Sequence, residues 1–154
     1  MNRKFNGMKI VIDSDDFCIR VYSNVAYLKV MGMQDEEAAI FFSKAIDQML
    51  EEYLYKDLAS ICDLSDLIIS SPEIARIINN AIRKLTRRLQ FEYNAVIVGL
   101  KFGQIVRAYI FSFYLRDTNL NTRVFSREDK AIDWIESKGF CIEEIKMFLM
   151  KHED

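Results

Sequence analysis

Two short polar segments hold the residues whose types could support chemistry, and each follows an apolar run. The first is Asp13-Ser14-Asp15-Asp16, directly after the apolar residues 8–12. Carboxylates at the end of an apolar strand can hold a magnesium ion and a phosphoryl group. One hypothesis is therefore a magnesium-dependent phosphotransfer or phosphatase-like protein that uses Asp13, Asp15 and Asp16. The alternative, which we favour, is a polar turn between two strands.

The second polar segment is a loop after the apolar residues 58–62, which begins with Asp63-Leu64-Ser65 and ends with Ser70-Ser71-Pro72-Glu73, where a strongly periodic helix starts. Small hydroxyl residues, carboxylates and a helix N-terminus meet at this one place in the sequence. Backbone N–H groups in the first turn of a helix have no partner within the helix and can bind an anion or another polar group. We therefore expect recognition to centre on this loop.

Several kinds of catalytic site are excluded by what the sequence lacks. The only histidine, His152, lies near an end that is expected to fray, so it is a poor base for a serine or cysteine nucleophile and a poor metal ligand. No GxGxxG or Walker segment is present to hold a nucleotide. We therefore expect no catalytic residue, no cofactor and no bound metal, and a protein that is not an enzyme.

Composition sets the size and class of the protein. The 154 residues are 51% hydrophobic, which suits a single domain over residues 1–154. The net charge of -2 argues against a nucleic-acid partner. Cys18, Cys62 and Cys141 form no CxxC pair, so buried, reduced thiols are expected. No segment resembles a signal peptide, and no apolar run approaches the roughly 20 residues that span a bilayer, so we expect a cytoplasmic protein without a membrane span.

Hydrophobic periodicity predicts strands that alternate with helices. Apolar or alternating runs of strand length lie at 8–12, 17–23, 25–31, 58–63, 94–99 and 122–125. Helical spacing predicts helices over about 35–54, 70–89, 103–116 and 126–139, and an additional terminal helix over 140–152.

Cap residues indicate where these helices start. The 70–89 helix has two possible registers, with either Ser70 and Glu73 as a capping box or Ser71 as the cap before Pro72. Ser126 with Asp129 resembles another capping box.

This order of elements predicts an α/β fold with a mixed, mostly parallel sheet, helices packed outside it and one core. The first two full strands form a hairpin, with Asn24 in its turn. Five residues from the predicted core should be largely buried, namely Cys62, Ile78, Val96, Val98 and Trp134.

Two apolar helix faces are not easily covered within one small domain. The 103–116 helix is apolar on almost every side, and the terminal helix carries the stripe Ile142, Ile145, Phe148 and Leu149. One hypothesis is a homodimer that forms through Ile105, Tyr109 and Phe113 together with the terminal helix. The alternative is a pocket for a lipid or another small ligand, lined by the aromatic helix.

Three stretches of the sequence share a pattern with a known family. They are Ile61-Cys62-Asp63-Leu64-Ser65-Asp66-Leu67-Ile68-Ile69-Ser70-Ser71-Pro72-Glu73-Ile74, Val96-Ile97-Val98-Gly99-Leu100 and the stretch from Val124 to Ile135. Together with the order of elements, they resemble the STAS family, also called SpoIIAA-like, the domain of sulfate transporters and anti-sigma factor antagonists. The resemblance covers about residues 17–138 and implies a STAS-like domain that binds other proteins.

The resemblance also implies a site. In the bacterial antagonists that this chain resembles, a partner kinase phosphorylates a serine at the helix start, and the phosphate switches binding. The matching hydroxyls are Ser71 and Ser70, but the family's Asp-Ser-Ser-Gly reads Ile69-Ser70-Ser71-Pro72 here. A phosphate at this helix start would be held by about 1 to 3 charge-assisted hydrogen bonds. Alternatively, the two serines only cap the helix.

We therefore predict a non-enzymatic regulatory module for protein–protein interaction, of the anti-sigma antagonist type, with a kinase or another regulator as its partner. Its predicted contact surface consists of the polar residues around the helix start: Asp63, Ser65, Glu73 and Arg76, with Ser71 and Ser70 as phosphoacceptor candidates. A module that binds without phosphorylation, the magnesium hypothesis and the small-ligand hypothesis remain open.

Overall fold

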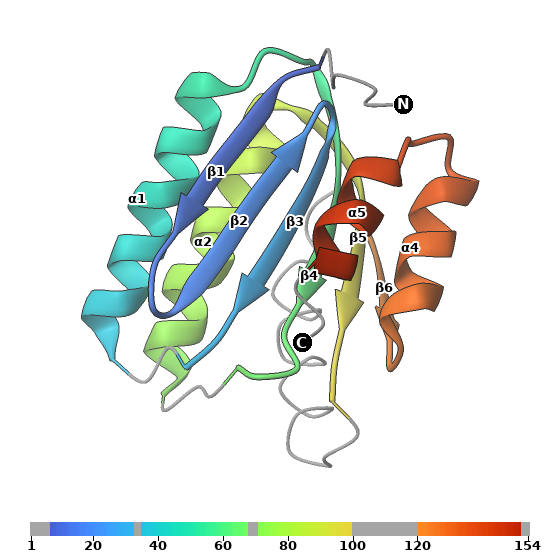
Figure 1. Ribbon diagram of the computed structural model, residues 1–154. Helices are drawn as coiled ribbons and strands as arrows, with labels where there is room; N and C mark the ends of the chain where they lie inside the picture. The colour runs from blue at the N-terminus through green and yellow to red at the C-terminus, as the bar shows by residue number, and fades with distance from the viewer. Residues whose placement is uncertain (1–6, 33–34, 68–70, 100–119, 152–154) are drawn as a thin grey trace.

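Six strands form one mixed sheet in which they lie in sequence order (Figure 1). The computed structural model describes residues 7–32, 35–67, 71–99 and 120–151. The strands are β1 (Lys9–Asp13), β2 (Phe17–Tyr22), β3 (Val25–Val30), β4 (Asp57–Asp63), β5 (Gln90–Ile97) and β6 (Asn121–Phe125). The β1–β2 and β2–β3 pairs are antiparallel, and the pairs from β3 to β6 are parallel.

The direction of each pair follows from its connection. The Ser14 N–H donates to the Phe17 carbonyl at 2.9 Å and closes the turn between β1 and β2. Ser23, with a φ of 54°, and Asn24 make the turn between β2 and β3. Longer connections return the chain between the later strands, which makes them parallel. The predicted hairpin and the mostly parallel sheet are confirmed.

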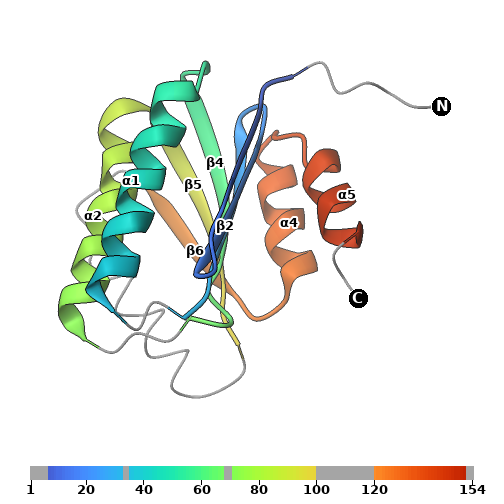
Figure 2. The ribbon, with the colours of Figure 1, turned by 60° about the vertical axis from the view of Figure 1, so that its left-hand side comes forward.

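In the described part of the chain, two helices cover each face of the sheet (Figure 2). On one face lie α1 (Glu36–Glu52) and α2 (Pro72–Arg88), and on the other lie α4 (Glu128–Ser137) and α5 (Glu143–Lys151). The Asp35 carboxylate accepts a hydrogen bond from the Ala38 N–H at 2.8 Å and starts α1. No helix in these ranges is both long enough and apolar enough to cross a membrane.

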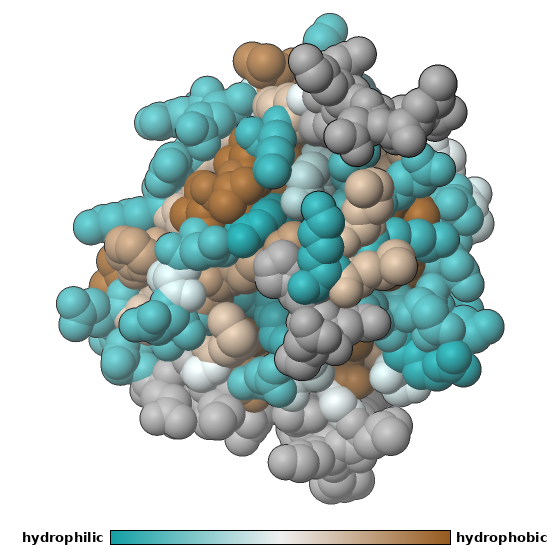
Figure 3. Space-filling view, viewed as in Figure 1, coloured by the Kyte–Doolittle hydropathy of each residue, from teal (hydrophilic) through white to brown (hydrophobic). Residues whose placement is uncertain are grey.

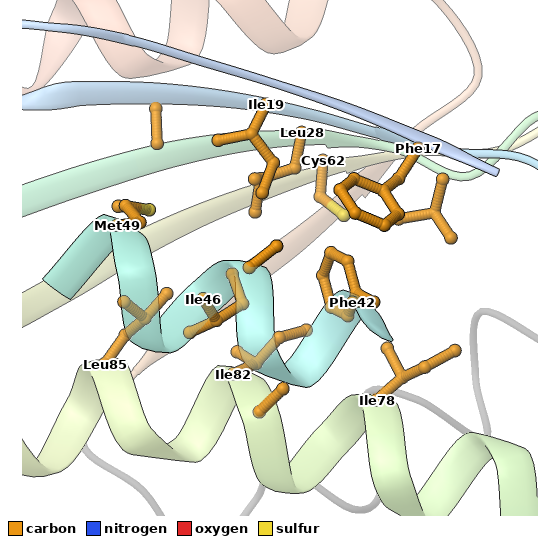
Figure 4. Packing of buried hydrophobic residues seen from close by; sticks show 14 of the residues in the cluster. Phe17, Ile19, Leu28, Phe42, Ile46, Met49, Cys62, Ile78, Ile82 and Leu85 are labelled. Carbon is orange, nitrogen blue, oxygen red and sulfur yellow. The ribbon is translucent and has the colours of Figure 1, made fainter. Parts of the chain in front are cut away.

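The first core lies between the sheet and the pair α1 and α2 (Figure 4). Phe17 of β2 meets Phe42 of α1 edge to face, with ring centroids 5.4 Å apart. Each large side chain that is fully buried here stabilises the fold by about 1.5–3 kcal/mol. Such residues include Phe17, Ile19, Leu28, Phe42, Ile46, Met49, Leu58, Ile78 and Leu85.

A second core fills the opposite face, between the sheet and the pair α4 and α5, so the single predicted core is in fact two. Its buried residues include Val25, Tyr27, Ala59, Ile61, Ala95, Ile97, Ala131, Ile132, Ile135, Ile142 and Ile145. We expected the terminal apolar stripe to be left for self-association. That expectation is wrong for Ile142 and Ile145, which are 1% and 0% exposed, because α5 folds back over the sheet.

The structure tests several local predictions. Cys62, Ile78, Val96 and Val98 are buried as predicted, whereas Trp134 is only partly buried. Ser71 rather than Ser70 is the N-cap of α2. The expected cap at Ser126 is wrong, because α4 begins one residue later, after Arg127, without a capping side chain.

Other predictions concern element boundaries. β5 begins at Gln90 rather than at residue 94, because its first residues alternate between exposed and buried positions instead of forming an apolar run. β1 and α5 lie outside residues 17–138, the range of the family resemblance, yet β1 pairs with β2 and α5 packs on the sheet. The predicted 103–116 helix, with Ile105, Tyr109 and Phe113, lies outside the described residues.

The cysteines differ in burial, which predicts their order of reaction with iodoacetamide at neutral pH. Cys141 is exposed, Cys18 is half-buried and Cys62 is buried, so the expectation of three buried thiols is wrong for Cys141. Burial raises the pKa of Cys62 from 9.0 to about 12, and that of Cys18 to about 11. Because the thiolate is the reactive form, we expect mass spectrometry to find Cys141 alkylated first and Cys62 only after unfolding. Alkylation of Cys62 in the folded protein as fast as Cys141 would contradict this packing.

Candidate functional site

The loop after β4 is anchored by a buried carboxylate. Asp63, the last residue of β4, is only 6% exposed. Its Oδ1 accepts hydrogen bonds from the Ser65 N–H at 2.9 Å and from the Ser65 hydroxyl at 2.6 Å. The Leu64 N–H donates to the Ile97 carbonyl at 2.8 Å. These bonds hold the first residues of the loop against the ends of β4 and β5.

The side chain of Tyr27, in β3, contacts the other oxygen of the same carboxylate. Its hydroxyl donates to Asp63 Oδ2 at 3.4 Å, inside the second core. Burial, with the Asp63 charge as the next largest cause, raises the pKa of Tyr27 far above its ordinary value of 10.0. The phenol therefore stays protonated and remains a hydrogen-bond donor over the whole physiological pH range.

Gly32, just after β3, joins two acidic loops that are far apart in the sequence. Its N–H donates to the Asp66 carbonyl at 3.3 Å, and it forms an isolated parallel bridge with Leu67. On its other side, a Cβ on Gly32 would lie 3.2 Å from Asp16 Oδ1. The φ of +59° also favours glycine at this position. Gly32 thus places the Asp13–Asp16 turn and the loop after β4 at the same end of the sheet.

Lys29 adds a charge contact to this end of the sheet. It lies opposite Asp63 in the β3–β4 register, and its Nζ is 3.3 Å from Asp66 Oδ2. Both side chains are partly exposed, so the pair contributes less to stability than the buried hydrogen bonds of Asp63.

The start of α2 presents its polar groups to solvent. The Ser71 hydroxyl accepts a hydrogen bond from the Ile74 N–H at 3.3 Å, and Pro72 occupies the first helical position. Arg76 Nη1 is 3.0 Å from Glu73 Oε2, and both side chains are more than half exposed. Ser71 is half-buried, while Pro72, Glu73 and Arg76 are exposed.

The acidic turn between β1 and β2 is organised by an arginine. Arg20 donates from Nη1 to Asp13 Oδ1 at 2.5 Å and from Nη2 to Asp13 Oδ2 at 2.7 Å. The Asp16 N–H donates to the Ser14 hydroxyl at 3.1 Å. Both oxygens of Asp13 thus face a guanidinium. Across the described ranges, no three His, Cys, Asp or Glu side chains are grouped so that they could hold a metal ion.

The predicted site residues that the structure describes therefore differ in exposure. Glu73 and Arg76 are exposed at the helix start and Ser71 is half-buried there, whereas Ser65 lies next to the end of β4 and bonds to Asp63. We expected Asp63 to be a contact residue. That expectation is corrected, because Asp63 is buried and supports the loop instead. Ser70 lies outside the described residues.

Sequence reasoning missed Tyr27, Lys29 and Gly32. Tyr27 and Lys29 lie two residues apart in a strand that carries apolar residues on both faces, so its pattern does not single them out. Their contacts with Asp63 and Asp66 depend on the pairing of β3 with β4, which the sequence does not show. Gly32 carried a usable signal, because a glycine directly after a strand often marks a backbone position with positive φ.

A separate hollow opens between the start of α4 and the end of α5, with a volume of about 540 Å³. Acidic, basic and apolar side chains line it, among them Glu128, Asp133, Lys146 and Leu149. This mixture has no single sign of charge to select an ionic ligand. The hollow is therefore a weaker candidate than the start of α2.

The sequence matches no model of a known protein family and no curated protein. Among solved structures, the chain is similar to an uncharacterised protein of the DUF3478 family with a SpoIIAA-like fold, from Shewanella loihica PV-4. The TM-score is 0.55 at 16% sequence identity, over 87% of this chain and 98% of that chain. The described chain therefore has a SpoIIAA-like fold, which confirms the resemblance at the level of the fold.

Removing the Ser71 hydroxyl should destabilise the protein. We expect Ser71→Ala to lower the free energy of unfolding by about 1 kcal/mol, because the Ile74 N–H loses its acceptor. Ser126→Ala is the matched control and should change it by less than about 0.5 kcal/mol, since Ser126 does not cap α4. Urea unfolding followed by circular dichroism measures both. Equal losses in the two variants would contradict the cap.

Asp63 should matter more to stability than Tyr27. We expect Asp63→Ala to cost about 1–3 kcal/mol, because it leaves the hydrogen-bond donors of Ser65 without their acceptor. Tyr27→Phe should cost less, because it removes one long bond and keeps the ring. Chemical unfolding of both variants compares them directly, and a larger loss for Tyr27→Phe would show that Asp63 is not the anchor of the loop.

Proposed function

We propose that this chain is a non-enzymatic regulatory module that binds a protein partner, a kinase or another regulator in the cytoplasm, through the start of α2. The observation that carries the proposal is the exposed polar helix start itself, capped by Ser71. Pro72, Glu73 and Arg76 are exposed, while Asp63 is buried and bonds to Ser65 earlier in the chain. The Ser71 cap and the Glu73–Arg76 ion pair order polar groups at this helix start before a partner binds, which lowers the entropic cost of binding.

Ser71 is the phosphoacceptor in this proposal. Its oxygen already faces the first-turn amides of α2, since it accepts from the Ile74 N–H. A phosphate there adds a charge of about −1.5 to −2 at pH 7 and is favoured by the helix dipole.

The two members of the neighbouring ion pair, Glu73 and Arg76, would act on this phosphate in opposite ways. Glu73 repels a phosphate on Ser71, while Arg76, which now pairs with Glu73 at 3.0 Å, is attracted to it. Phosphorylation therefore rearranges the charges that a partner meets. A partner that selects the Glu73–Arg76 pair would bind the unmodified form, and one that selects the phosphate would bind the modified form.

The SpoIIAA-like fold supports this reading over the two rivals. The magnesium hypothesis is weakened because Arg20 already binds both carboxylate oxygens of Asp13. The small-ligand hypothesis rests on the 103–116 segment, which lies outside the described residues.

Affinity capture from the native cell tests the proposal. Tagged wild type, Ser71→Ala and Ser71→Asp are compared by quantitative mass spectrometry, with Ser126→Ala and Ser126→Asp as matched controls. We expect Ser71→Asp to change the amount of at least one captured protein by about tenfold, the effect of roughly 1.4 kcal/mol, while both Ser126 variants behave as wild type. Phosphopeptide mapping of the wild type should find phosphate on Ser71 or Ser70.

A second pair of variants separates binding from phosphorylation. Glu73→Lys and Arg76→Glu change the exposed surface and leave Ser71 in place. If they alter capture while the Ser71 variants do not, the surface binds a partner without a phosphate switch. If all four variants capture the same proteins in wild-type amounts, the start of α2 is not the contact surface.

A further inference from the structure

β1 is an edge strand with a defined outer side. Within the described sheet, its neighbour is β2, and no described strand lies beyond it (Figure 1). The Ser23 N–H donates to the Met8 carbonyl, and the Ser14 N–H donates to the Phe17 carbonyl. In an antiparallel pair, hydrogen-bonded and non-hydrogen-bonded positions alternate. The even-numbered residues therefore face β2, and the backbone groups of Lys9, Val11 and Asp13 point outward.

The side chains of these three residues share one face of the sheet. They lie opposite Tyr22, Arg20 and Cys18 of β2 in the register. Val11 is 48% exposed, a large value for a valine within a strand. Figure 3 shows a hydrophobic area along β1 on this face, bordered by hydrophilic side chains.

The charges of the strand are complementary to themselves under a two-fold rotation. β1 reads Lys9-Ile10-Val11-Ile12-Asp13, with a cation at one end and an anion at the other. If two copies run antiparallel with Val11 opposite Val11, each Lys9 comes opposite the other copy's Asp13. Opposite charges directly across an antiparallel pair are stabilising.

We propose that β1 is the contact strand for a second copy of this chain, in an isologous dimer whose two-fold axis passes beside Val11. The register joins the two sheets into one. It places each outward N–H of Lys9 and Val11 opposite a carbonyl of the second copy, because residues 9, 11 and 13 become hydrogen-bonded positions. The same register brings the two half-exposed Val11 side chains together.

An aromatic side chain beside β1 supports this interface. Phe41 of α1 is 54% exposed, and its ring centroid is 5.7 Å from that of Phe17 at the β1–β2 turn. Ser43, which is 200° away around the helix, contacts Lys84 of α2. Phe41 therefore lies on the flank of α1 away from α2, which is the flank nearest β1 (Figure 2). A second copy at β1 would come close to this flank.

The opposite edge strand lacks these properties. β6 is centred on Arg123, an exposed residue. Antiparallel self-pairing about this centre would place two guanidinium groups opposite each other, which is unfavourable. The β6 edge therefore provides a matched control, through its exposed valine, Val124, which is 38% exposed.

The contacts that Lys9 and Asp13 make within one chain are compatible with the dimer. Lys9 Nζ is 5.9 Å from the centroid of the Tyr22 ring, and Asp13 is paired with Arg20. The Asp13 side chain is still 52% exposed, so it can face Arg20 and the second copy's Lys9 together. In the dimer each carboxylate lies between two cations.

Sedimentation of the full chain over a range of concentrations tests the proposal. We expect the wild type to approach twice its mass of 18.1 kDa as concentration rises. Val11→Lys should weaken the dimer on the order of tenfold, because two ammonium groups then face each other at the axis. Val124→Lys should leave the association unchanged. Circular dichroism confirms that each variant is folded.

Cross-linking gives a second reading that does not depend on Val11→Lys. Opposed Cα atoms at a hydrogen-bonded position are about 5.5 Å apart, within the range that a disulfide spans. In a Cys141→Ser background, Val11→Cys should form a covalent dimer on mild oxidation, and Val124→Cys should not. A wild type that stays monomeric at every concentration, a dimer indifferent to Val11→Lys, or cross-linking through Val124→Cys alone would each overturn the proposal.

Discussion

The central strands of this protein are covered on both faces, and most of its structure follows from that constraint. Six of the seven residues of β4 are buried, because α1 and α2 lie over one face and α4 and α5 over the other. A polar side chain in such a strand must find its partner inside the fold. Ser60 of β4 meets this demand by donating to Asn94 of β5 at 2.7 Å, and Asp63 meets it through Ser65 and Tyr27.

The same constraint explains why some residues of the candidate site are buried and others are exposed. Asp63 can remain a buried acceptor because the second core and the ends of β4 and β5 surround it. At the start of α2, by contrast, Pro72, Glu73 and Arg76 are exposed. The buried hydrogen bonds of Asp63 and the exposed charges of Glu73 and Arg76 share no side chain, so a change of charge at this helix start leaves the buried bonds in place.

The two edges of the sheet differ because the connections differ. Tight turns make β1, β2 and β3 antiparallel, whereas α1 returns the chain from β3 to β4 and α2 returns it from β4 to β5. β1 is consequently a short outer strand with a cation and an anion at its two ends, and β6 is an outer parallel strand centred on Arg123. The chemistry of each edge is thus set by the few residues of its outer strand.

By itself, the sequence determined the order and type of the described elements, the SpoIIAA-like fold and the start of α2 to within one residue, because periodicity and capping act within a few residues. The structure then chose Ser71 as the cap. The tertiary structure alone decided which residues support the site. Asp63 reads as a polar loop residue until β3 and β5 flank it, and Gly32 joins Asp16 to Asp66 only when strands distant in sequence align. Such contacts depend on strand register and on which helix covers which face, and these are non-local properties that no local pattern encodes.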